Sequence, residues 1–171
     1  MIFVVTGLHF QGFDRLVRMM DDIALKLNMK VIIQRGYAGY VPKNAESFTF
    51  KSNEEIESLY KNAEIVITHA GVGSIMSALS FGRPIIVIPR LSKYHEHKND
   101  HQIDIANFFL KQDLVSVANN MSELEVEIKK IRKGVARFSK YEFGREKTRL
   151  IGCLYRYLRA TEDALHAGKR R

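Results

Sequence analysis

Residues 64–88 read EIVITHAGVGSIMSALSFGRPIIVI and place two apolar runs on either side of a glycine turn and a short helix-like segment. Glu64–Thr68 and Ile85–Ile88 are rich in β-branched residues, as are parallel strands that are buried on both faces. Between them, the turn at Gly71 and Gly73 leads into a predicted helix over Ser74–Phe81. A strand, a helix and a buried strand in this order form a βαβ unit, so the stretch predicts a parallel α/β sheet.

The same alternation continues outward from this stretch in both directions. Apolar runs alternate with segments whose apolar residues recur at helical spacing, which predicts an α/β fold, a Rossmann-like parallel sheet with helices on both faces. The predicted strands are Ile2–Thr6, Val31–Gln34, Ser47–Phe50 and Leu114–Val117; the predicted helices are Phe13–Leu27, Asn99–Lys111, one capped by Asn53 and one with Ser122 and Glu125 as its capping box.

The net charge of +8 is distributed unevenly along the 171 residues. Residues 1–131 contain 15 basic and 15 acidic side chains, whereas residues 132–171 contain 12 basic and 4 acidic ones. A neutral body with a basic end is not the pattern of a uniformly basic nucleic-acid binder. We therefore divide the chain into a Rossmann-like domain over 1–131 and a basic amphipathic C-terminal helical extension over 132–171.

The extension has the pattern of an amphipathic helix. Its apolar side must cover a surface, either on its own domain or in a groove of a partner, and its basic side suits anionic lipid headgroups. The apolar side holds Lys147, Leu150, Ile151, Leu154, Leu158 and Leu165, and the basic side holds Arg145, Arg149, Arg156 and Arg159.

Composition restricts the cellular setting. Hydrophobic residues make up 46% of the chain, which argues against disorder, and a single cysteine, Cys153, permits no intramolecular disulfide. A reducing, cytoplasmic compartment is therefore expected. The apolar start Met1–Val5 is interpreted as a first strand rather than a signal peptide, and no apolar run approaches the ~20 residues of a membrane span. We expect any attachment to a membrane to be peripheral.

In open parallel sheets, ligands bind at the carboxyl ends of the strands, which directs attention to the strand-to-helix turns. One such turn runs from Thr68 to Ile75 and contains a Gly-x-Gly pattern before the helix. This pattern suits a diphosphate, because glycines let the backbone approach a ligand and a helix start offers free N–H groups. The same glycines are equally compatible with a tight turn and no ligand.

The turn that follows the strand at 85–88 is long and contains His95, His97 and His101. No cysteine lies nearby and the imidazoles straddle a loop-to-helix boundary, so we expect no metal site. Hydrogen bonding of His101 and Gln102 to a polyhydroxyl ligand is one interpretation, and a solvated helix start is the other.

The first turn, Thr6-Gly7-Leu8-His9, contains a histidine that is either a candidate base or a polar loop residue. The sequence shows no Ser-His-Asp order, no Walker glycine-lysine motif and no cysteine-based site. Hydrolase and phosphate-loop chemistries are therefore not indicated.

Taken together, these turns resemble the donor-binding C-terminal half of glycosyltransferase family 28. The likeness covers residues 1 to about 131 and is strongest with small single-half members, which act as subunits in glycolipid or exopolysaccharide synthesis. The residues that carry it are Ile65–Ile75, Ala78 and Leu79, Gly82 and Pro84, Val87–Pro89, the Asn-Asp-His-Gln run at 99–102, and Val5–Gly7 with Phe13–Leu16.

The resemblance implies the C-terminal half of a GT-B enzyme that is active only with a partner subunit. The reaction would be inverting hexosyl transfer from a UDP-sugar to a lipid-diphosphate-linked saccharide. A membrane-anchored subunit would bind this acceptor and hold the chain at the cytosolic membrane face. No metal or other cofactor is expected, because a helix N-terminus and backbone amides can stabilise the leaving UDP.

The resemblance also assigns residues. Ser77 stands where many relatives have a carboxylate that binds the ribose hydroxyls, so weaker ribose recognition is expected. His9 is the local candidate for the catalytic base, unless the partner supplies the base. The donor-binding residues are Thr6 and Gly7 in the first turn, His69, Gly71, Val72, Gly73 and Ser74 at the diphosphate, Ser77 at the ribose, and His101 and Gln102 at the sugar.

A second interpretation is a non-catalytic module that binds a nucleotide sugar or a nucleic acid. Exposed aromatic side chains among basic residues form stacking surfaces for single strands. The extension contains such aromatics at Phe138, Tyr141, Phe143, Tyr155 and Tyr157. Binding of UDP but not of oligonucleotides would favour the glycosyltransferase, and binding of oligonucleotides would favour the nucleic-acid module.

Overall fold

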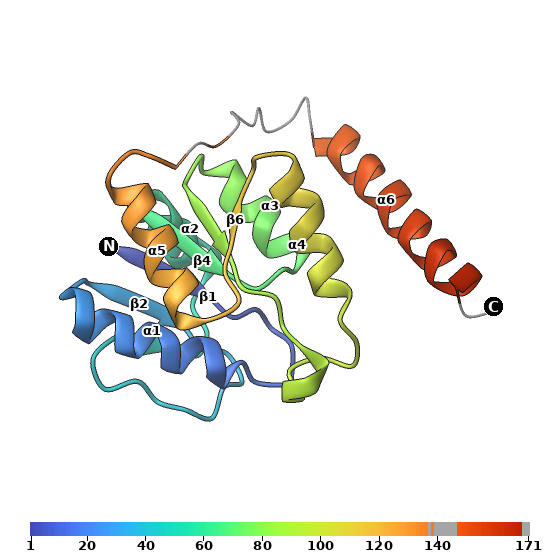
Figure 1. The fold of residues 1–171 in the computed structure, drawn as a ribbon. Coiled ribbons are helices and arrows are strands. Elements are labelled where there is room, and N and C mark those ends of the chain that lie inside the picture. Colours follow the sequence, from blue (N-terminus) through green and yellow to red (C-terminus); the bar gives the residue numbers. More distant parts are fainter. Residues whose placement is uncertain (137, 139–146, 169–171) are drawn as a thin grey trace.

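The computed structural model describes residues 1–136, 138 and 147–168, of which 161–168 are described as backbone only. Six parallel strands form one sheet in the order β3-β2-β1-β4-β5-β6 (Figure 1), which confirms the predicted α/β class. The strands are β1 (Ile2–Val5), β2 (Val31–Gln34), β3 (Glu46–Phe48), β4 (Ile65–Thr68), β5 (Ile85–Val87) and β6 (Ser116–Val117). The helices are α1 (Asp14–Leu27), α2 (Asn53–Asn62), α3 (Val72–Ser80), α4 (His101–Lys111), α5 (Met121–Arg132) and α6 (Lys147–Gly168), with a 3₁₀ turn η1 (Ser92–Tyr94).

Each face of the sheet has its own hydrophobic core. Ile2 and Val4 of β1 point to the face that α1 and α5 cover, whereas Phe3 and Val5 point to the opposite face, with α2, α3 and α4 (Figure 1). This alternation follows from the two-residue period of a strand. Because both faces are covered, the central strands β1 and β4 are apolar at every position except Thr68, as their sequence predicts.

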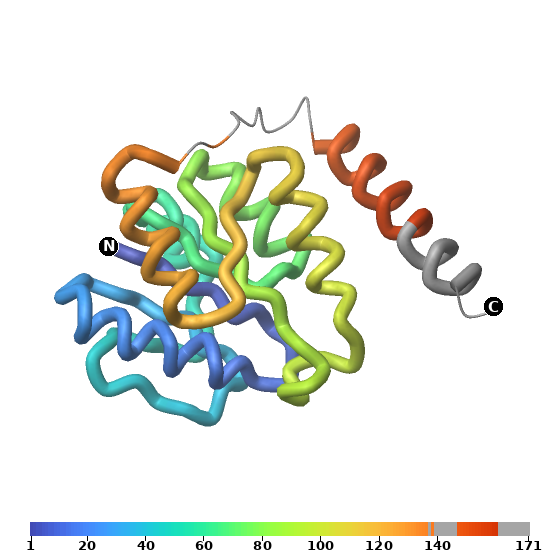
Figure 2. Tube along the Cα trace, viewed as in Figure 1, coloured from blue at the N-terminus to red at the C-terminus, as the bar shows by residue number. Residues whose placement is uncertain are grey.

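Helix α6 packs on α4 of its own domain. Leu154 is buried, and Leu150 and Leu158 pack against the core on this face of the sheet. The part of α6 whose side chains the structure describes is the red helix of Figure 2. Tyr157 lies against Phe108 with 5.5 Å between the ring centroids. The amphipathic pattern is thus confirmed for Leu150, Leu154 and Leu158, and its apolar side covers the chain's own domain.

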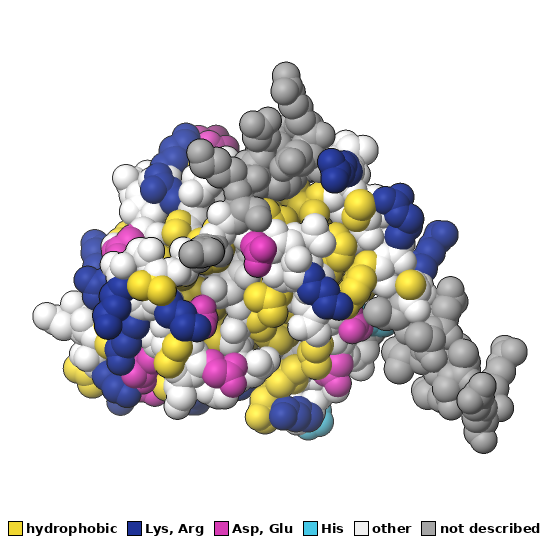
Figure 3. All heavy atoms as spheres, turned by 45° about the horizontal axis from the view of Figure 1, so that its top comes forward, with side chains coloured by type: hydrophobic (Ala, Val, Ile, Leu, Met, Phe, Trp, Pro, Cys, Tyr) yellow, Lys and Arg dark blue, Asp and Glu magenta, His cyan; other side chains and the backbone are white. Residues whose placement is uncertain are grey.

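The polar side of α6 is exposed at Arg149, Arg156 and Arg159. Lys147, predicted on the apolar side, is exposed as well, whereas Arg145, Tyr141 and Phe143 and the Leu165 side chain lie outside the described residues. Across the face drawn in Figure 3, Lys and Arg side chains form separate groups with acidic side chains among them. Within the described residues, no helix is long and apolar enough to cross a membrane.

The start of α3 differs from the prediction. The helix begins at Val72 rather than at Ser74, with Gly71 as its N-cap. Helical hydrogen bonding starts there because the Gly71 carbonyl accepts the Ile75 N–H at 3.1 Å. Gly73 therefore lies in the first turn of the helix and not in the loop before it.

Two predicted caps were placed wrongly. Ser52, one residue before Asn53, caps α2 and forms a capping box with Glu55. Asn120 caps α5 by accepting the Glu123 N–H, so Ser122 is not the cap. Glu125, the other half of that predicted box, instead accepts a 2.5 Å hydrogen bond from Lys26 on α1.

Several element boundaries also shift by one or two residues. Only Ser116 and Val117 of the predicted strand over 114–117 pair with β5, although Leu114 and Val115 are buried. Helix α4 begins at His101 rather than at Asn99. Asp100 stays in the loop because its carboxylate accepts the N–H and the hydroxyl of Ser92.

Candidate functional site

A cavity of about 570 Å³ opens at the carboxyl ends of β1 and β4. These two neighbouring strands are the point from which the strand order runs outward in both directions, and open α/β sheets bind ligands in the crevice at such a point. The cavity is lined by Val5, Gly7, Leu8, Gln34, Phe50, Lys51, Asn53, Ile56, Tyr60, His69, Gly71, Gly73, Ser74 and Ser77.

His69 lies at the centre of this edge, directly after β4, with its ring between two glycines. A Cβ atom on Gly7 would lie 2.4 Å from the imidazole Nε2, and one on Gly71 would lie 2.1 Å from Cε1. Gly7 also has φ of +81°, a conformation that favours glycine. Both positions therefore require glycine, for a close approach to a side chain of the protein itself.

The His69 ring bonds to the start of α3. Its Nδ1 accepts the Gly71 N–H at 3.0 Å, and its Nε2 lies 3.0 Å from Ser74 Oγ. Burial, together with the positive charge of Arg90 and the neighbouring His9 and His97, lowers the pKa of His69 to about 3. The ring is therefore neutral at physiological pH.

Gln102 joins the turns after β4 and β5 by hydrogen bonds. The side chain is buried, and its Oε1 accepts the N–H groups of Ala70 and Arg90, each at 3.1 Å. Its Nε2 lies 3.4 Å from His69 Nδ1. Gln102 thus holds the two turns in place behind the cavity wall.

The first turn of α3 is suited to an anion. Its N-cap, Gly71, makes no side-chain capping bond, so the first amides of the helix have no side-chain oxygen as acceptor. The partial positive charge of a helix N-terminus adds to these donors. Val72, Gly73 and Ser74 supply this turn, and their binding of a diphosphate stays a prediction.

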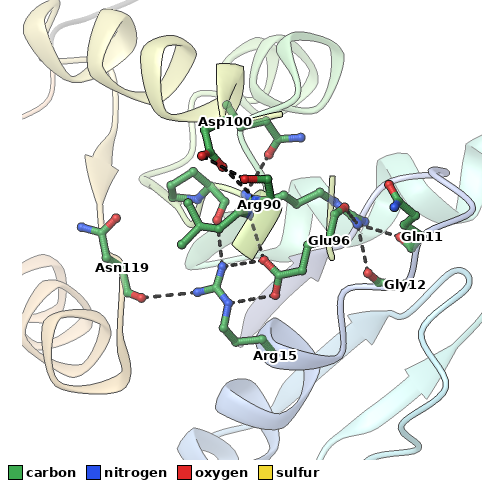
Figure 4. A network of polar contacts seen from close by, with 11 residues as sticks. Gln11, Gly12, Arg15, Arg90, Glu96, Asp100 and Asn119 are labelled. Atoms are coloured by element: carbon green, nitrogen blue, oxygen red, sulfur yellow. Dashed lines mark hydrogen bonds and ion pairs between the residues drawn. The ribbon is translucent and has the colours of Figure 1, made fainter. Parts of the chain in front are cut away.

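Beside the cavity lies a cluster of charged side chains formed by the buried Arg90 and Glu96 and the half-buried Arg15, here named the Arg90 cluster (Figure 4). Arg15 binds the Glu96 carboxylate through Nε at 2.9 Å and donates to the Pro89 carbonyl at 2.8 Å. The Arg90 guanidinium is 1% exposed and donates to four backbone carbonyls, those of Thr6, Gln11, Gly12 and Glu96.

Sequence reasoning missed the Arg90 cluster. Burial lowers the pKa of Arg90 to about 10, which still leaves the guanidinium charged at neutral pH. The one local signal was an arginine directly after an apolar strand, at Pro89-Arg90. Phe50 and Lys51 were also missed as cavity residues, although they lie at the carboxyl end of the predicted strand over 47–50 and strand ends are where ligands bind.

Not every predicted site residue lines the cavity. Gly7, His69, Gly71, Gly73, Ser74 and Ser77 do. Thr6 is buried and its hydroxyl donates to the Gln34 carbonyl at 2.9 Å, and His101 is exposed at the first residue of α4. Sugar binding by His101 and Gln102 stays a prediction.

His9 lies near the cavity in the first turn. Its Nδ1 accepts the Gln11 N–H at 3.2 Å, and its ring stacks on Phe10 with 4.6 Å between centroids. Burial and the nearby positive charges of Arg90, His97 and Lys98 lower the pKa of His9. With Nδ1 accepting a hydrogen bond, the neutral ring has its proton on Nε2, a geometry that suits a donor better than a base.

Among the residues that the structure describes, no three His, Cys, Asp or Glu side chains are grouped closely enough to hold a metal ion. Of the histidines after β5, His97 has partners of its own: its Nδ1 lies 3.1 Å from Asn99 Oδ1, and its ring centroid lies 5.3 Å from that of His9. The cavity's polar groups are hydroxyls, amides, an imidazole and one lysine, a set that suits an anionic, hydroxyl-rich ligand.

Curated relatives match parts of the chain. The human UDP-N-acetylglucosamine transferase subunit ALG13 is 30% identical over 88 residues, which cover 48% of this chain and 7% of that protein. The subunit of the same name from Candida albicans is 35% identical over 65 residues, which cover 38% of this chain and 20% of that protein. The matched segment is thus a small part of each relative.

Solved structures share the fold at low sequence identity. An NMR structure of ALG13 is similar with a TM-score of 0.60 at 20% identity, over 90% of this chain and 96% of that one. The calicheamicin glycosyltransferase CalG4 is similar with a TM-score of 0.60 at 15% identity, over 97% of this chain and 41% of that one. The sheet is therefore that of GT-B C-terminal halves.

The model of one protein family matches residues 1–147, which is most of the chain and includes every residue that lines the cavity. The chain belongs to the glycosyltransferase family 28 C-terminal domain family.

Proposed function

We propose that this chain is the donor-binding catalytic subunit of a two-component inverting glycosyltransferase. It would transfer a hexose from a UDP-sugar to a lipid-diphosphate-linked saccharide. The observation that carries the proposal is the cavity between β1 and β4, where the His69–Ser74 pair and the uncapped start of α3 meet. The printed name of the ALG13 relatives, a UDP-N-acetylglucosamine transferase subunit, supports a UDP-sugar as the donor.

The chemistry requires stabilisation of a leaving group. As the bond between the sugar and UDP breaks, negative charge develops on the β-phosphate, and donors that are already oriented toward it lower the barrier. The α3 amides and the Ser74 hydroxyl would bind that charge. We propose that this electrostatic stabilisation replaces a metal ion, so that no cofactor takes part in the transfer.

The acceptor hydroxyl loses a proton during transfer and needs a base. His9 is the candidate within this chain, but its Nδ1 already accepts the Gln11 N–H. On the neutral ring Nε2 then has a proton and can only donate. We therefore assign the base to the acceptor-binding partner in preference to His9.

A partner subunit is part of the proposal. The ALG13 relatives are named as subunits, and the matched family describes a C-terminal domain, which supports a separate acceptor-binding half. This partner would supply the membrane anchor and place the chain at the cytosolic membrane face. The exposed arginines of α6 are available to it or to anionic headgroups, since the apolar side of that helix is already covered.

Nucleotide binding tests the donor half of the proposal. UDP should raise the melting temperature of the purified chain more than UMP does, and oligonucleotides should leave it unchanged. A protein that responds to no uridine nucleotide would contradict the proposal. Co-expression with the product of a neighbouring reading frame, followed by assay of a panel of UDP-sugars on lipid-linked acceptors, then tests transfer and identifies the sugar.

The non-catalytic binding module remains an outcome of the same assays. A stabilising effect of oligonucleotides would favour nucleic acid, although Tyr157, one of the aromatics on which that interpretation depends, packs against Phe108. Nucleotide-sugar binding without transfer in the reconstituted pair would favour a binding module.

A further inference from the structure

We infer that His69 is a positioning residue that fixes the Ser74 hydroxyl as a hydrogen-bond donor toward a phosphate oxygen of the bound nucleotide. Gln102 sets the direction of the hydrogen bonds, and the three side chains are named here the Gln102–His69–Ser74 relay. The inference rests on the proposed function, because the phosphate oxygen belongs to the diphosphate of the UDP-sugar.

The first step is the orientation of Gln102. Its amide oxygen accepts two backbone N–H groups, those of Ala70 and Arg90, each at 3.1 Å. A flipped amide would place its NH₂ against both of these donors, so the orientation is determined by the network. The NH₂ end is therefore the group that lies 3.4 Å from His69 Nδ1.

The second step is the tautomer of His69. Two N–H donors approach Nδ1, from Gly71 at 3.0 Å and from Gln102 at 3.4 Å. A proton on Nδ1 would point at both donors, so the neutral ring has its proton on Nε2. His69 therefore donates to Ser74 Oγ across the 3.0 Å contact.

The third step is the direction of the Ser74 hydroxyl. Because Oγ accepts from His69, its own proton is available for a different partner, and Ser74 lines the cavity. A hydroxyl held in this way offers a donor, as do the amides of the α3 N-terminus beside it. A group that only accepts hydrogen bonds, such as a phosphate oxygen, matches this set of donors.

The fourth step is the fixed position of the ring. Gly7 and Gly71 both contact the imidazole so closely that neither could have a side chain. The ring is thus held in place by backbone on two sides, and burial keeps it neutral at physiological pH. The relay therefore keeps one polarity throughout the range in which the enzyme would work.

A double-mutant cycle on UDP affinity, measured by calorimetry, tests the relay. Ser74→Ala should weaken UDP binding about tenfold or more, because a bond to a charged acceptor is lost. His69→Leu should weaken it several-fold alone and by less than about twofold in the Ser74→Ala background. His69→Gln, which retains an N–H donor, should restore part of the affinity.

Ser77→Ala provides the matched control, because Ser77 is a serine of the same helix and the same cavity without a contact to His69 in the described hydrogen bonds. Its effect should add to that of His69→Leu. If His69→Leu weakens binding equally in the Ser74→Ala background, His69 has a general structural role and the relay is overturned.

Imidazole ¹⁵N chemical shifts of the free protein provide a readout that needs no ligand. His69 should show a protonated Nε2 and an unprotonated Nδ1 from pH 8 to pH 5. A protonated Nδ1 overturns the relay whatever the protein binds. If the wild-type chain binds no uridine nucleotide, the proposed function fails, and inorganic diphosphate replaces UDP in the same cycle; absence of diphosphate binding or of coupling there also overturns the relay.

Discussion

Two groups of buried polar side chains lie next to each other at the carboxyl edge of the sheet, and they differ in charge and in what they leave available. In the Arg90 cluster, guanidinium and carboxylate groups are bonded to backbone and to each other. In the Gln102–His69–Ser74 relay, every group is neutral, and Ser74 lines the cavity, where we infer that its hydroxyl proton is available to a ligand. The two meet at Arg90, whose backbone N–H bonds to Gln102.

The difference indicates that the Arg90 cluster mainly stabilises the fold, whereas the relay mainly serves ligand binding. A buried charge is costly unless hydrogen bonds compensate it. Arg90 donates from Nη1 and Nη2 to carbonyls in the turns after β1 and β5, while its buried Nε has no hydrogen-bond partner. A neutral pair needs no such compensation, so it can leave one donor for a ligand. Substitutions in the Arg90 cluster should therefore affect stability first, and substitutions in the relay should affect binding first.

The largest effect is expected for Arg90→Met. The substitution removes the donors of four backbone carbonyls in a buried site, so the free energy of unfolding should fall by about 4 kcal/mol. Urea unfolding followed by circular dichroism measures the change. Arg18→Met is the control, because Arg18 is exposed and stacks on Tyr40, and its loss should cost about 1 kcal/mol or less. Equal losses in the two variants would mean that Arg90 does not hold the turns together.

The next effect is expected for Gly71→Ala. A Cβ atom 2.1 Å from the His69 ring must displace a ring that Gly7 blocks on its other side, so we expect a loss of about 2 kcal/mol in unfolding free energy and weaker UDP binding. The change in the Nε2–Ser74 bond should also appear in the imidazole ¹⁵N shifts.

Gly73→Ala is the matched control in the same glycine pattern. A Cβ there meets nothing within 4 Å, and the residue is helical, so alanine should leave stability unchanged or raise it by up to about 1 kcal/mol. A loss as large as that of Gly71→Ala would contradict the steric argument.

The sheet could be predicted because each strand is marked by an apolar run of consecutive residues, which is a local feature of the sequence. The apolar runs at 2–5, 31–34, 65–68 and 85–87 are strands in the structure. Gly71 and Gly73 of the pattern after β4 line the cavity, and diphosphate binding by this turn stays a prediction. The element ends were less predictable because they depend on contacts. Gly71, the N-cap of α3, donates its N–H to the His69 ring. Glu125 takes no part in a cap, because its carboxylate accepts a hydrogen bond from Lys26, which is distant in sequence.

The roles inside the site could not be obtained from the sequence for the same reason. His69 and Gly71 are neighbours in the motif, but Gly7 and Gln102, which set the position and polarity of the ring, come from other turns. Arg90 acts on carbonyls at residues 6, 11 and 12. A motif identifies which turn binds a ligand, whereas the direction of each hydrogen bond depends on the packing of several turns.

The pH dependence of stability offers a smaller and more specific effect. The folded-state pKa of His69, about 3, lies below the ordinary value of 6.5, so between these values the unfolded chain binds a proton that the folded chain does not. The free energy of unfolding should therefore fall on acidification from pH 6.5, by up to about 1.4 kcal/mol per pH unit from this residue. Above pH 6.5 the residue should have no effect.

Comparison with His69→Gln isolates this contribution, because carboxylates common to both proteins cancel. Urea unfolding at intervals from pH 8 to pH 4.5 should show the stability of the wild type falling relative to the variant only below pH 6.5. A constant difference over the whole range would mean that the imidazole titrates normally in the folded protein and would weaken the comparison between a neutral relay and a charged cluster.

The smallest effect is expected for Ser77→Glu, which introduces a negative charge into the cavity that Ser74 also lines. Ser77 is exposed on α3 one turn beyond Ser74 and lines the same cavity. A carboxylate there should accept hydrogen bonds from the ribose hydroxyls and raise the affinity for UDP about threefold to tenfold, measured by calorimetry. If affinity falls instead, the carboxylate lies close enough to repel the diphosphate, and the nucleotide must bind with its phosphates farther along α3 than the relay predicts. The sign of this change thus locates the diphosphate relative to Ser74 and Ser77 on the same helix.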